Sequence, residues 1–103
     1  MERKYKEEEI KRRIEKQCGL QMEEFEFIGA GWDSEAFLIN QQYVFKFPKR
    51  ESSEKRLEIE AKVLRKLEQE KTKIQVPKIC FEGRDENAIP KIFYGYHISR
   101  VID

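Results

Sequence analysis

The sequence predicts an α+β fold: a five-stranded antiparallel sheet, one helix inserted after the third strand, and a second helix at the N-terminus. Three observations lead to this prediction. Apolar residues recur at helical spacing near the N-terminus and again in the middle of the chain. Three short apolar segments between these helices are joined by short polar turns, as in an antiparallel meander. Two further apolar segments follow the second helix, and 103 residues suit a single domain with one modest core.

The N-terminal helix is predicted over residues 2–17. Ile10, Ile14 and Cys18 recur at a spacing of four, and Gly19 stands where a glycine commonly ends a helix. Because the apolar stripe is thin, we expect this helix to pack on the outside of a larger body and to expose a charged face. That face contains three pairs of opposite charge in the stabilising orientation: Glu7–Lys11, Glu8–Arg12 and Glu9–Arg13.

The first three strands are predicted between the two helices. Residues 24–28 alternate polar and apolar side chains, which is the period of a strand with one buried face. Pro48 ends the third strand, because proline cannot continue a central ladder. The elements between these points are a turn at Gly29-Ala30-Gly31, a strand over 36–39, a polar turn over 40–42 and a strand over 43–47.

The second helix is predicted over residues 53–70. Ser52 and Ser53 are available to cap its N-terminus, and Glu54 opposes the helix dipole from the first turn. Val76-Pro77 breaks the helical pattern. The buried face is predicted from the apolar residues at helical spacing: Leu57, Ala61, Val63, Leu64 and Leu67.

The last two strands complete the sheet. A fourth strand over residues 79–81 ends at Gly83, residues 84–87 form a polar turn, and a fifth strand covers residues 92–96. We therefore treat residues 1–103 as one domain with three parts: the N-terminal helix (1–18), the sheet with its inserted helix (19–97) and a C-terminal segment (98–103).

The composition excludes several classes of protein. Charged residues make up 40% of the chain, yet 21 basic and 20 acidic residues leave a net charge of only +1, which argues against a nucleic-acid partner. No window approaches the roughly 18 apolar residues of a membrane span, and no secretory signal is visible. Cys18 and Cys80 are solitary, with no histidine cluster nearby, so we expect reduced thiols, no zinc site and a cytoplasmic protein.

Lys46 is the most informative single residue. It is the only basic residue in the apolar segment 43–48, which has the pattern of a buried strand, where an unpaired ammonium costs several kcal/mol. Two anionic partners are available: a ligand phosphate cradled by the glycine turn at 29–31, and Glu60 on the second helix. The alternative is a lysine at a sheet edge whose ammonium extends into water.

Glu60 falls within the apolar stripe of the second helix, whereas Glu54 and Glu58 fall toward the predicted solvent side. A carboxylate on a packed face needs a partner, and Lys46 is the evident candidate. The alternative is that Glu60 only borders the stripe and extends into water.

The surroundings of Lys46 suit a nucleotide. Glycines in the turn at 29–31 let backbone N–H groups approach a phosphate closely, although they equally serve an ordinary hairpin. The G-x-G-x-x-G pattern is also incomplete, because its last position is Ser34. Val44 and Lys46 point to the same face of a strand, so a base in contact with Val44 would extend its phosphates to Lys46. Ala36 on the neighbouring strand is small enough for a flat ring to approach.

Two segments around Lys46 carry a longer motif. Residues 27–37 read FIGAGWDSEAF, with a G-x-G-x-D segment, and residues 44–49 read VFKFPK. These segments resemble the aminoglycoside phosphotransferases, a family with a protein-kinase-like fold, and are closest to the branch that modifies the 2″ hydroxyl. Three other segments of the chain resemble parts of the same family. Residues 60–67 resemble its glutamate-bearing helix, residues 74–77 its loop into the next strand, and residues 93–96 its approach to the hinge between the lobes. The resemblance covers roughly residues 20–100 and implies a kinase-like small lobe, with 98–103 at the start of the hinge.

The resemblance implies roles for these residues. Lys46 binds the phosphates of ATP or GTP, which the family uses with magnesium, and Glu60 holds Lys46 in place. Trp32 packs over the phosphate loop or is simply an exposed loop residue. The other nucleotide-binding residues shape the phosphate loop (Gly29, Gly31 and Ser34), line the base pocket (Ala36 and Val44) or meet the base edge through their backbone (Tyr96, His97 and Ile98).

The resemblance also implies what the chain lacks. Kinase-like enzymes orient the substrate hydroxyl with an Asp and hold magnesium with an Asn and a second Asp, all on the C-terminal lobe. Asp33, Asp85 and Asp103 stand in neither an H-x-D nor a D-F-G segment, and His97 is expected at the surface. We therefore expect no catalytic residue and no metal ligand here, an absent C-terminal catalytic lobe, and no phosphate transfer by this chain alone.

Three interpretations stay open. The chain is the N-terminal lobe of an aminoglycoside phosphotransferase-like enzyme, or a free-standing module that keeps the fold and binds a nucleotide. The third interpretation is a protein-interaction module, which self-associates through the apolar surface where the second lobe docks.

Overall fold

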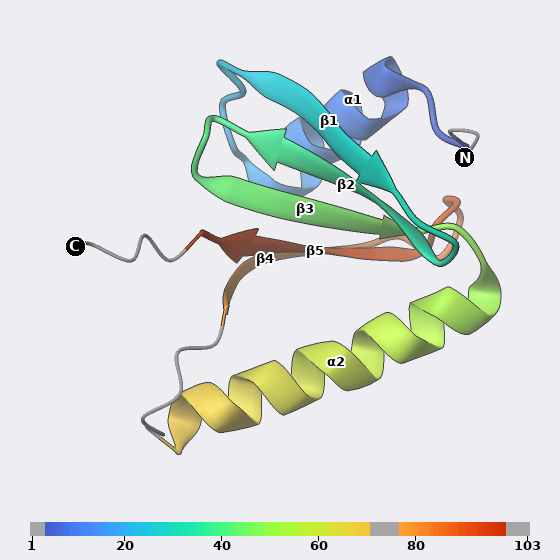
Figure 1. Ribbon diagram of the computed structural model, residues 1–103. Coiled ribbons are helices and arrows are strands. Elements are labelled where there is room, and N and C mark those ends of the chain that lie inside the picture. The colour runs from blue at the N-terminus through green and yellow to red at the C-terminus, as the bar shows by residue number, and fades with distance from the viewer. Residues whose placement is uncertain (1–3, 71–76, 99–103) are drawn as a thin grey trace.

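The computed structural model describes residues 4–70 and 77–98 (Figure 1). It confirms the predicted fold class, a five-stranded antiparallel sheet with a helix before the first strand and another after the third. Within these ranges, neither helix combines the length and the apolar character that crossing a membrane requires. The elements are α1 (Glu7–Cys18), β1 (Phe25–Ala30), β2 (Ser34–Ile39), β3 (Tyr43–Pro48), α2 (Glu51–Gln69), β4 (Lys78–Arg84) and β5 (Ile92–His97).

The sheet has the strand order β1-β2-β3-β5-β4, and all neighbours are antiparallel. The first three strands form the predicted meander, whereas β5 pairs with β3 and leaves β4 at the edge. The β2–β3 turn has positive φ at Asn40 (53°) and Gln41 (55°), the type I′ geometry whose twist matches that of the strands. Asn40 Oδ1 also accepts hydrogen bonds from the amides of Glu23 (2.7 Å) and Glu24 (2.9 Å), which fixes the approach to β1.

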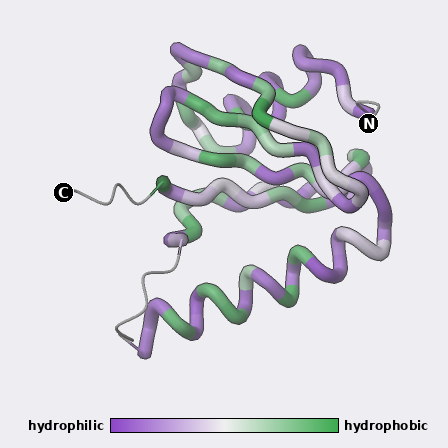
Figure 2. Tube along the Cα trace, viewed as in Figure 1, coloured by the Kyte–Doolittle hydropathy of each residue, from purple (hydrophilic) through white to green (hydrophobic). Residues whose placement is uncertain are grey.

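Each face of the sheet packs against one helix, because alternate side chains of a strand point to opposite faces. Hydrophobic and hydrophilic positions alternate along α2 in keeping with one buried side (Figure 2). The core under α2 contains Leu57 and Ala61 with Ile92, Tyr94 and Tyr96 of β5. The larger core lies under α1, where Ile10 and Ile14 meet fully buried residues of the sheet: Phe37, Ile39, Phe45, Phe47 and Phe93. Each buried phenylalanine contributes roughly 1.5–3 kcal/mol, so the α1 side supplies most of the hydrophobic stabilisation.

The N-terminal helix starts later than predicted, at Glu7 and not at residue 2. Lys6 has an extended backbone (φ −79°, ψ 140°), and Lys4 and Tyr5 before it bind the sheet. The Tyr5 hydroxyl donates to the Pro48 carbonyl, and the Lys4 amide donates to the buried carboxylate of Glu35. These contacts between distant parts of the chain override the helical periodicity. At the other end, the left-handed conformation of the residue after Cys18 (φ 66°) closes α1 as predicted.

The predicted cap of α2 and one residue of its predicted buried face are wrong. The helix begins at Glu51 after Arg50, which makes no side-chain cap, so neither predicted serine caps the helix. The buried Ser53 hydroxyl instead donates to Asp33 in the β1–β2 turn. Val63, predicted on the buried face, is 50% exposed. The side toward the sheet is occupied by Leu57, Ala61 and Leu64.

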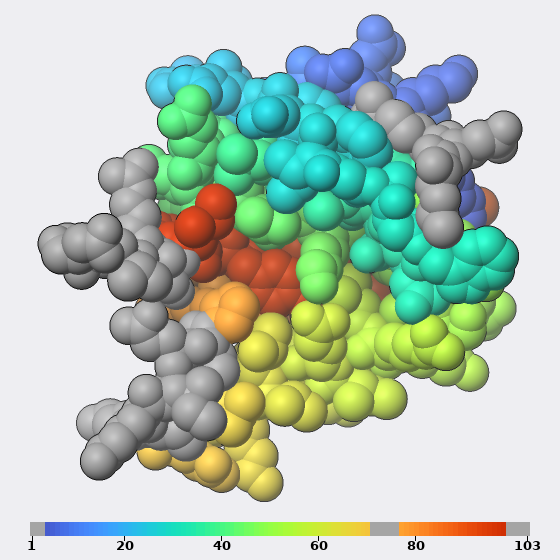
Figure 3. Space-filling view, viewed as in Figure 1, coloured from blue at the N-terminus to red at the C-terminus, as the bar shows by residue number. Residues whose placement is uncertain are grey.

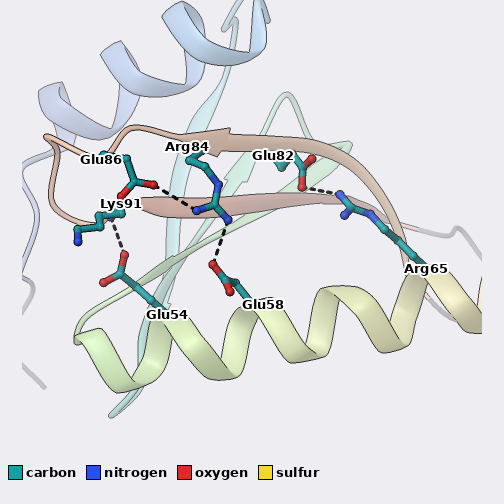
Figure 4. Close-up of polar contacts among 7 residues, drawn as sticks. All are labelled: Glu54, Glu58, Arg65, Glu82, Arg84, Glu86 and Lys91. Atoms are coloured by element: carbon teal, nitrogen blue, oxygen red, sulfur yellow. Dashed lines mark hydrogen bonds and ion pairs between the residues drawn. The ribbon is translucent and has the colours of Figure 1, made fainter.

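Glu54 and Glu58, predicted on the solvent side of α2, face β4 and β5 instead (Figure 4). They have polar partners there, because the edge strand and the turn after it carry charged residues. The contacts are Lys91 N–Glu54 (2.6 Å), Arg84–Glu58 (3.0 Å), Arg84–Glu86 (3.4 Å) and Arg65–Glu82 (2.6 Å). These exposed polar contacts therefore orient α2 on the sheet beside its small apolar core.

The other predicted strands are confirmed with small changes of their ends. Pro48 is the last residue of β3. β4 starts one residue before the predicted fourth strand and ends one residue after Gly83, where that strand was predicted to end. The predicted break at Val76 and the segment from residue 99 onward lie outside the described residues.

Candidate functional site

The register of the sheet brings five predicted site residues to one face, which α2 covers only in part: Gly29, Ala36, Val44, Lys46 and Tyr96. Two rows of paired residues cross this face: Gly29–Ala36–Lys46–Tyr94 and Leu38–Val44–Tyr96. The predicted common face of Val44 and Lys46 is therefore confirmed. In the space-filling view, atoms of β5 (red) are visible between β3 (green) and α2 (yellow), so the face is open to solvent there (Figure 3).

The predicted contact between Lys46 and Glu60 is present. Lys46 Nζ lies 3.4 Å from Glu60 Oε1, and the side chains are 36% and 45% exposed. The prediction that Lys46 is buried is wrong, because only the opposite face of β3, with Phe45 and Phe47, is closed off from water. An exposed pair of this kind stabilises a fold by less than about 1 kcal/mol. Glu60 thus orients an ammonium that remains accessible to a ligand.

Tyr96 lies beside this pair and was predicted to contribute only backbone groups. Its ring centroid is 5.7 Å from Lys46 Nζ, and its side chain is buried. Within the described part of the chain, its hydroxyl has no hydrogen-bond partner. Burial raises the pKa of Tyr96, and the nearby Glu60 and Tyr94 raise it further, so the phenol stays protonated. A buried polar atom without a partner calls for an explanation, and a ligand bound on this face is one.

The glycine turn differs in detail from the prediction. β1 continues through Gly29 and Ala30 with a bulge after Phe27, and the turn itself starts at Gly31, whose amide donates to the Ser34 carbonyl at 2.9 Å. A Cβ on Gly29 would meet no atom within 4 Å, and one on Gly31 would meet only the Ser34 carbonyl oxygen at 3.8 Å.

Neither glycine of this turn is therefore required by the packing of the chain itself. Gly95 shows the contrast, since a Cβ there would lie 2.6 Å from the Phe45 ring. The backbone of Gly29 and Gly31 is instead open to approach from outside, which is the property that phosphate binding needs.

The turn is attached to α2 and to the residue before it. Asp33 Oδ2 accepts a hydrogen bond from Arg56 Nη1 at 2.9 Å, and Asp33 Oδ1 accepts one from the Ser53 hydroxyl at 3.2 Å. Trp32 is 65% exposed, and the Arg50 guanidinium lies 3.8 Å from its ring centroid. Of the two alternatives for Trp32, the structure thus favours an exposed residue, with a cation stacked on it.

Comparisons with known proteins identify the family. The family model described as the phosphotransferase enzyme family matches residues 24–99. The chain belongs to the phosphotransferase enzyme family. Among curated proteins, none matches this chain.

Solved structures of aminoglycoside phosphotransferases have the fold of this phosphotransferase family member. The GDP and kanamycin complex of APH(2″)-IIIa is 26% identical with a TM-score of 0.74, over 86% of this chain and 29% of that chain. The ADP-bound aminoglycoside phosphotransferase APH(2″)-Ib is 27% identical with a TM-score of 0.71, over 88% and 28%. The streptomycin–ATP complex of APH(2″)-IIa is 28% identical with a TM-score of 0.71, over 92% and 29%.

These matches confirm the likeness to the 2″-phosphotransferases and the kinase-like small lobe expected from the sequence. The chain spans less than a third of the length of each of these solved chains, whose matched shares are 28–29%.

The remaining predicted site residues of the phosphotransferase family member lie at the ends of strands. Ser34 begins β2 and contributes its carbonyl to the turn. His97 ends β5, is exposed, and has its ring 5.5 Å from that of Tyr43. The Ile98 amide donates to the Gln42 carbonyl at 2.8 Å, so this backbone group, one of those predicted to meet a base, is already paired. Across residues 4–70 and 77–98, no three or more His, Cys, Asp or Glu side chains form a group that could hold a metal ion.

Proposed function

We propose that this phosphotransferase family member is the nucleotide-binding lobe of an aminoglycoside phosphotransferase and binds ATP or GTP on the sheet face beside α2. The contact of Lys46 Nζ with Glu60 Oε1 at 3.4 Å carries the proposal. It presents an oriented, accessible ammonium in the same row of the sheet as the open backbone of Gly29. An ammonium next to a glycine backbone that no Cβ shields is the chemistry that recognises a phosphate.

The residues of the face fit such a ligand. Lys46 binds the phosphates and Glu60 keeps the ammonium in position. The phosphate loop is built from Gly29, Gly31 and Ser34, and Ala36 and Val44 line the base pocket. Backbone groups of Tyr96, His97 and Ile98 meet the base edge, other than the Ile98 amide, which already donates to the Gln42 carbonyl. The orphaned Tyr96 hydroxyl is a polar group that a nucleotide can satisfy. The solved relatives support this assignment, because their structures are described as complexes with GDP, ADP and ATP.

A bound triphosphate supplies the phosphoryl group that such enzymes transfer. Transfer also needs magnesium ligands and a residue that orients the substrate hydroxyl. The described residues do not provide a metal site, so we assign these groups to a second lobe. The greater length of the solved relatives supports that assignment.

We extend the proposal to the substrate and the compartment of the whole protein. Relatives have been solved with kanamycin and streptomycin, which makes an aminoglycoside the substrate class and antibiotic resistance the biological role. Both cysteines are free thiols, as is usual for a cytoplasmic protein.

The test is a nuclear magnetic resonance titration with magnesium–ATP and, separately, magnesium–GTP. We expect shifts in the amide signals of Gly29, Gly31, Ser34 and Lys46 with at least one nucleotide. The variant Lys46→Ala should bind about ten- to hundredfold more weakly, since it loses a charged contact to phosphate. Lys55→Ala, which removes the same charge from an exposed position on α2, is the matched control and should bind as the wild type does.

Two outcomes would count against the proposal. Absence of shifts at these amides with either nucleotide at millimolar concentration rejects nucleotide binding. Equal loss of affinity in the two lysine variants rejects the assigned site, because it points to a general effect of net charge.

A further inference from the structure

We infer that Asp33 is a positioning residue, which clamps the β1–β2 turn onto α2 and so ties the phosphate loop to the helix that holds Lys46. This inference rests on the proposed function, since it concerns the same nucleotide site. It adds a residue to that site which makes no contact with Lys46 and whose role follows from its contacts across the fold.

The clamp uses every acceptor of Asp33. Oδ1 accepts from the buried Ser53 hydroxyl at 3.2 Å and Oδ2 accepts from Arg56 Nη1 at 2.9 Å. The backbone carbonyl accepts from the Lys49 amide at 2.8 Å, just before α2. Three contacts from one turn residue thus reach the segment before α2 and its first two turns.

A second contact supports the same turn. Arg50 Nη2 donates to the Trp32 carbonyl at 3.3 Å, and the Arg50 guanidinium stacks on the Trp32 ring at 3.8 Å. Both Trp32 and Asp33 are therefore held from the α2 side. On its own strand side the turn has the hydrogen bond from the Gly31 amide to the Ser34 carbonyl, next to a bulge in β1.

The position of the clamp on α2 gives it a function. Glu60 lies about two helical turns beyond Ser53 on the same rigid element. The turn and Lys46 are consequently both attached to α2. The turn is attached through Asp33, and Lys46 through Glu60. A shift of α2 moves the backbone amides of the turn and the ammonium together, which preserves their spacing for a phosphate chain.

The charge of Asp33 is consistent with this role. A free carboxylate in a phosphate loop would repel the ligand, whereas a carboxylate paired with Arg56 carries little net charge toward it. Both oxygens of Asp33 are directed to α2 residues, so the side chain serves the fold of the loop.

The experiment uses three test variants, which are Asp33→Asn, Arg56→Gln and the double variant of these two. Each is compared with a fourth variant, Asp85→Asn. The last is the matched control, because Asp85 stands in the β4–β5 turn and its carboxylate accepts from the Asn87 amide at 2.9 Å. Circular dichroism first establishes that each variant is folded. Hydrogen exchange without nucleotide then reports on the turn, and titration with a nucleoside triphosphate and with the corresponding nucleoside reports on the phosphate-dependent part of binding.

In the absence of nucleotide, we expect Asp33→Asn to speed exchange of the Gly31 and Lys49 amides about fivefold and to leave the Phe45 amide unchanged. Triphosphate affinity should fall about fivefold while nucleoside affinity stays constant, because only the phosphates contact the turn. The double variant should resemble Asp33→Asn, since the Arg56 contact is one of those that Asp33→Asn already weakens. Asp85→Asn should change neither quantity.

The outcomes separate this inference from the proposed function. A wild type that binds no triphosphate rejects the proposed function, and the role of Asp33 in nucleotide binding is then rejected with it, whatever hydrogen exchange reports about the turn. A wild type that binds, with unchanged exchange in Asp33→Asn, rejects the clamp. Faster exchange with unchanged triphosphate affinity rejects the positioning role, and equal weakening of triphosphate and nucleoside rejects it in favour of a general structural effect.

Discussion

Lys46 Nζ and Glu60 Oε1 lie 3.4 Å apart across the gap between β3 and α2, and both side chains remain in contact with water. The pair joins two elements without burying a charge. It therefore avoids the desolvation cost of an internal ion pair and contributes little to the stability of the fold. Its main consequence is geometric, because it directs one ammonium toward the open face of the sheet.

The first prediction concerns this division between stability and binding. Glu60→Gln should lower nucleotide affinity about fivefold, because the Lys46 ammonium loses the charge that orients it. The free energy of unfolding should change by less than about 1 kcal/mol, since the pair is exposed. Titration and urea unfolding of the same samples measure the two effects. Glu15→Gln, at an exposed position of α1, is the control and should change neither the nucleotide affinity nor the free energy of unfolding. A larger loss of stability than of nucleotide binding in Glu60→Gln would contradict the view that the pair serves binding.

The second prediction concerns the core under α1. The rings of Phe47 and Phe93 are stacked with centroids 4.4 Å apart, and both residues are fully buried. Phe47→Ala should lower the free energy of unfolding by about 3–5 kcal/mol, from lost burial and the cavity left behind. Denaturant unfolding measures the loss, and Ile89→Ala, at a residue that is 75% exposed, should change it by less than about 0.5 kcal/mol. Comparable effects of the two substitutions would show that this core is not the main source of stability.

The third prediction concerns alkaline pH. Burial raises the pKa of Tyr5, helped by Glu35 and Glu54, and burial also raises the pKa of Tyr96, helped by Glu60. A raised pKa means that the folded protein keeps its phenolic protons to higher pH than the unfolded chain does. The resulting stability is complete below about pH 10, the pKa of an unperturbed tyrosine, and is lost as pH rises above it. Tyr5→Phe and Tyr96→Phe should each reduce this alkaline loss in urea unfolding.

The same two variants should differ at neutral pH. The Tyr5 hydroxyl donates to the Pro48 carbonyl, so Tyr5→Phe should cost about 0.5–1.5 kcal/mol of stability. The Tyr96 hydroxyl has no partner among the described residues, so Tyr96→Phe should be neutral or stabilising. An equal cost for both variants would mean that Tyr96 is hydrogen-bonded in solution.

The fourth prediction concerns the two thiols. Burial raises the pKa of Cys18 to about 11, with a smaller opposing effect from Arg13, whereas Cys80 is exposed on the edge strand β4. Since the thiolate is the reactive form, an alkylating reagent near neutral pH should label Cys80 first and Cys18 only after unfolding. Mass spectrometry of partly labelled protein identifies the modified residue. Labelling of Cys18 at the rate of Cys80 would show that α1 opens readily in solution.

Much of the architecture could be predicted from local pattern. Alternation in residues 24–28, the polar turn around Asn40 and the proline after Phe47 are local signals, and the strands they predict are present. The Lys46–Glu60 contact was also predictable, because a basic residue in an apolar strand and an acidic residue beside an apolar helix stripe need partners. The side of α2 on which Glu54, Glu58 and Val63 lie could not be predicted in this way. The edge strand opposite α2 offers Arg84 and thereby favours acidic residues on the side that faces the sheet.

The sequence by itself determined the elements, their order, the family likeness and the pairing of Lys46 with Glu60, since each depends on periodicity or on a local motif. Only the tertiary structure decided that β5 pairs with β3, that the Tyr96 ring lies beside Lys46, and that Asp33 binds Ser53 and Arg56. The physical reason is that these relationships join segments distant in the chain. Their free energy depends on which surfaces meet when the sheet and α2 pack, and no local pattern records that choice.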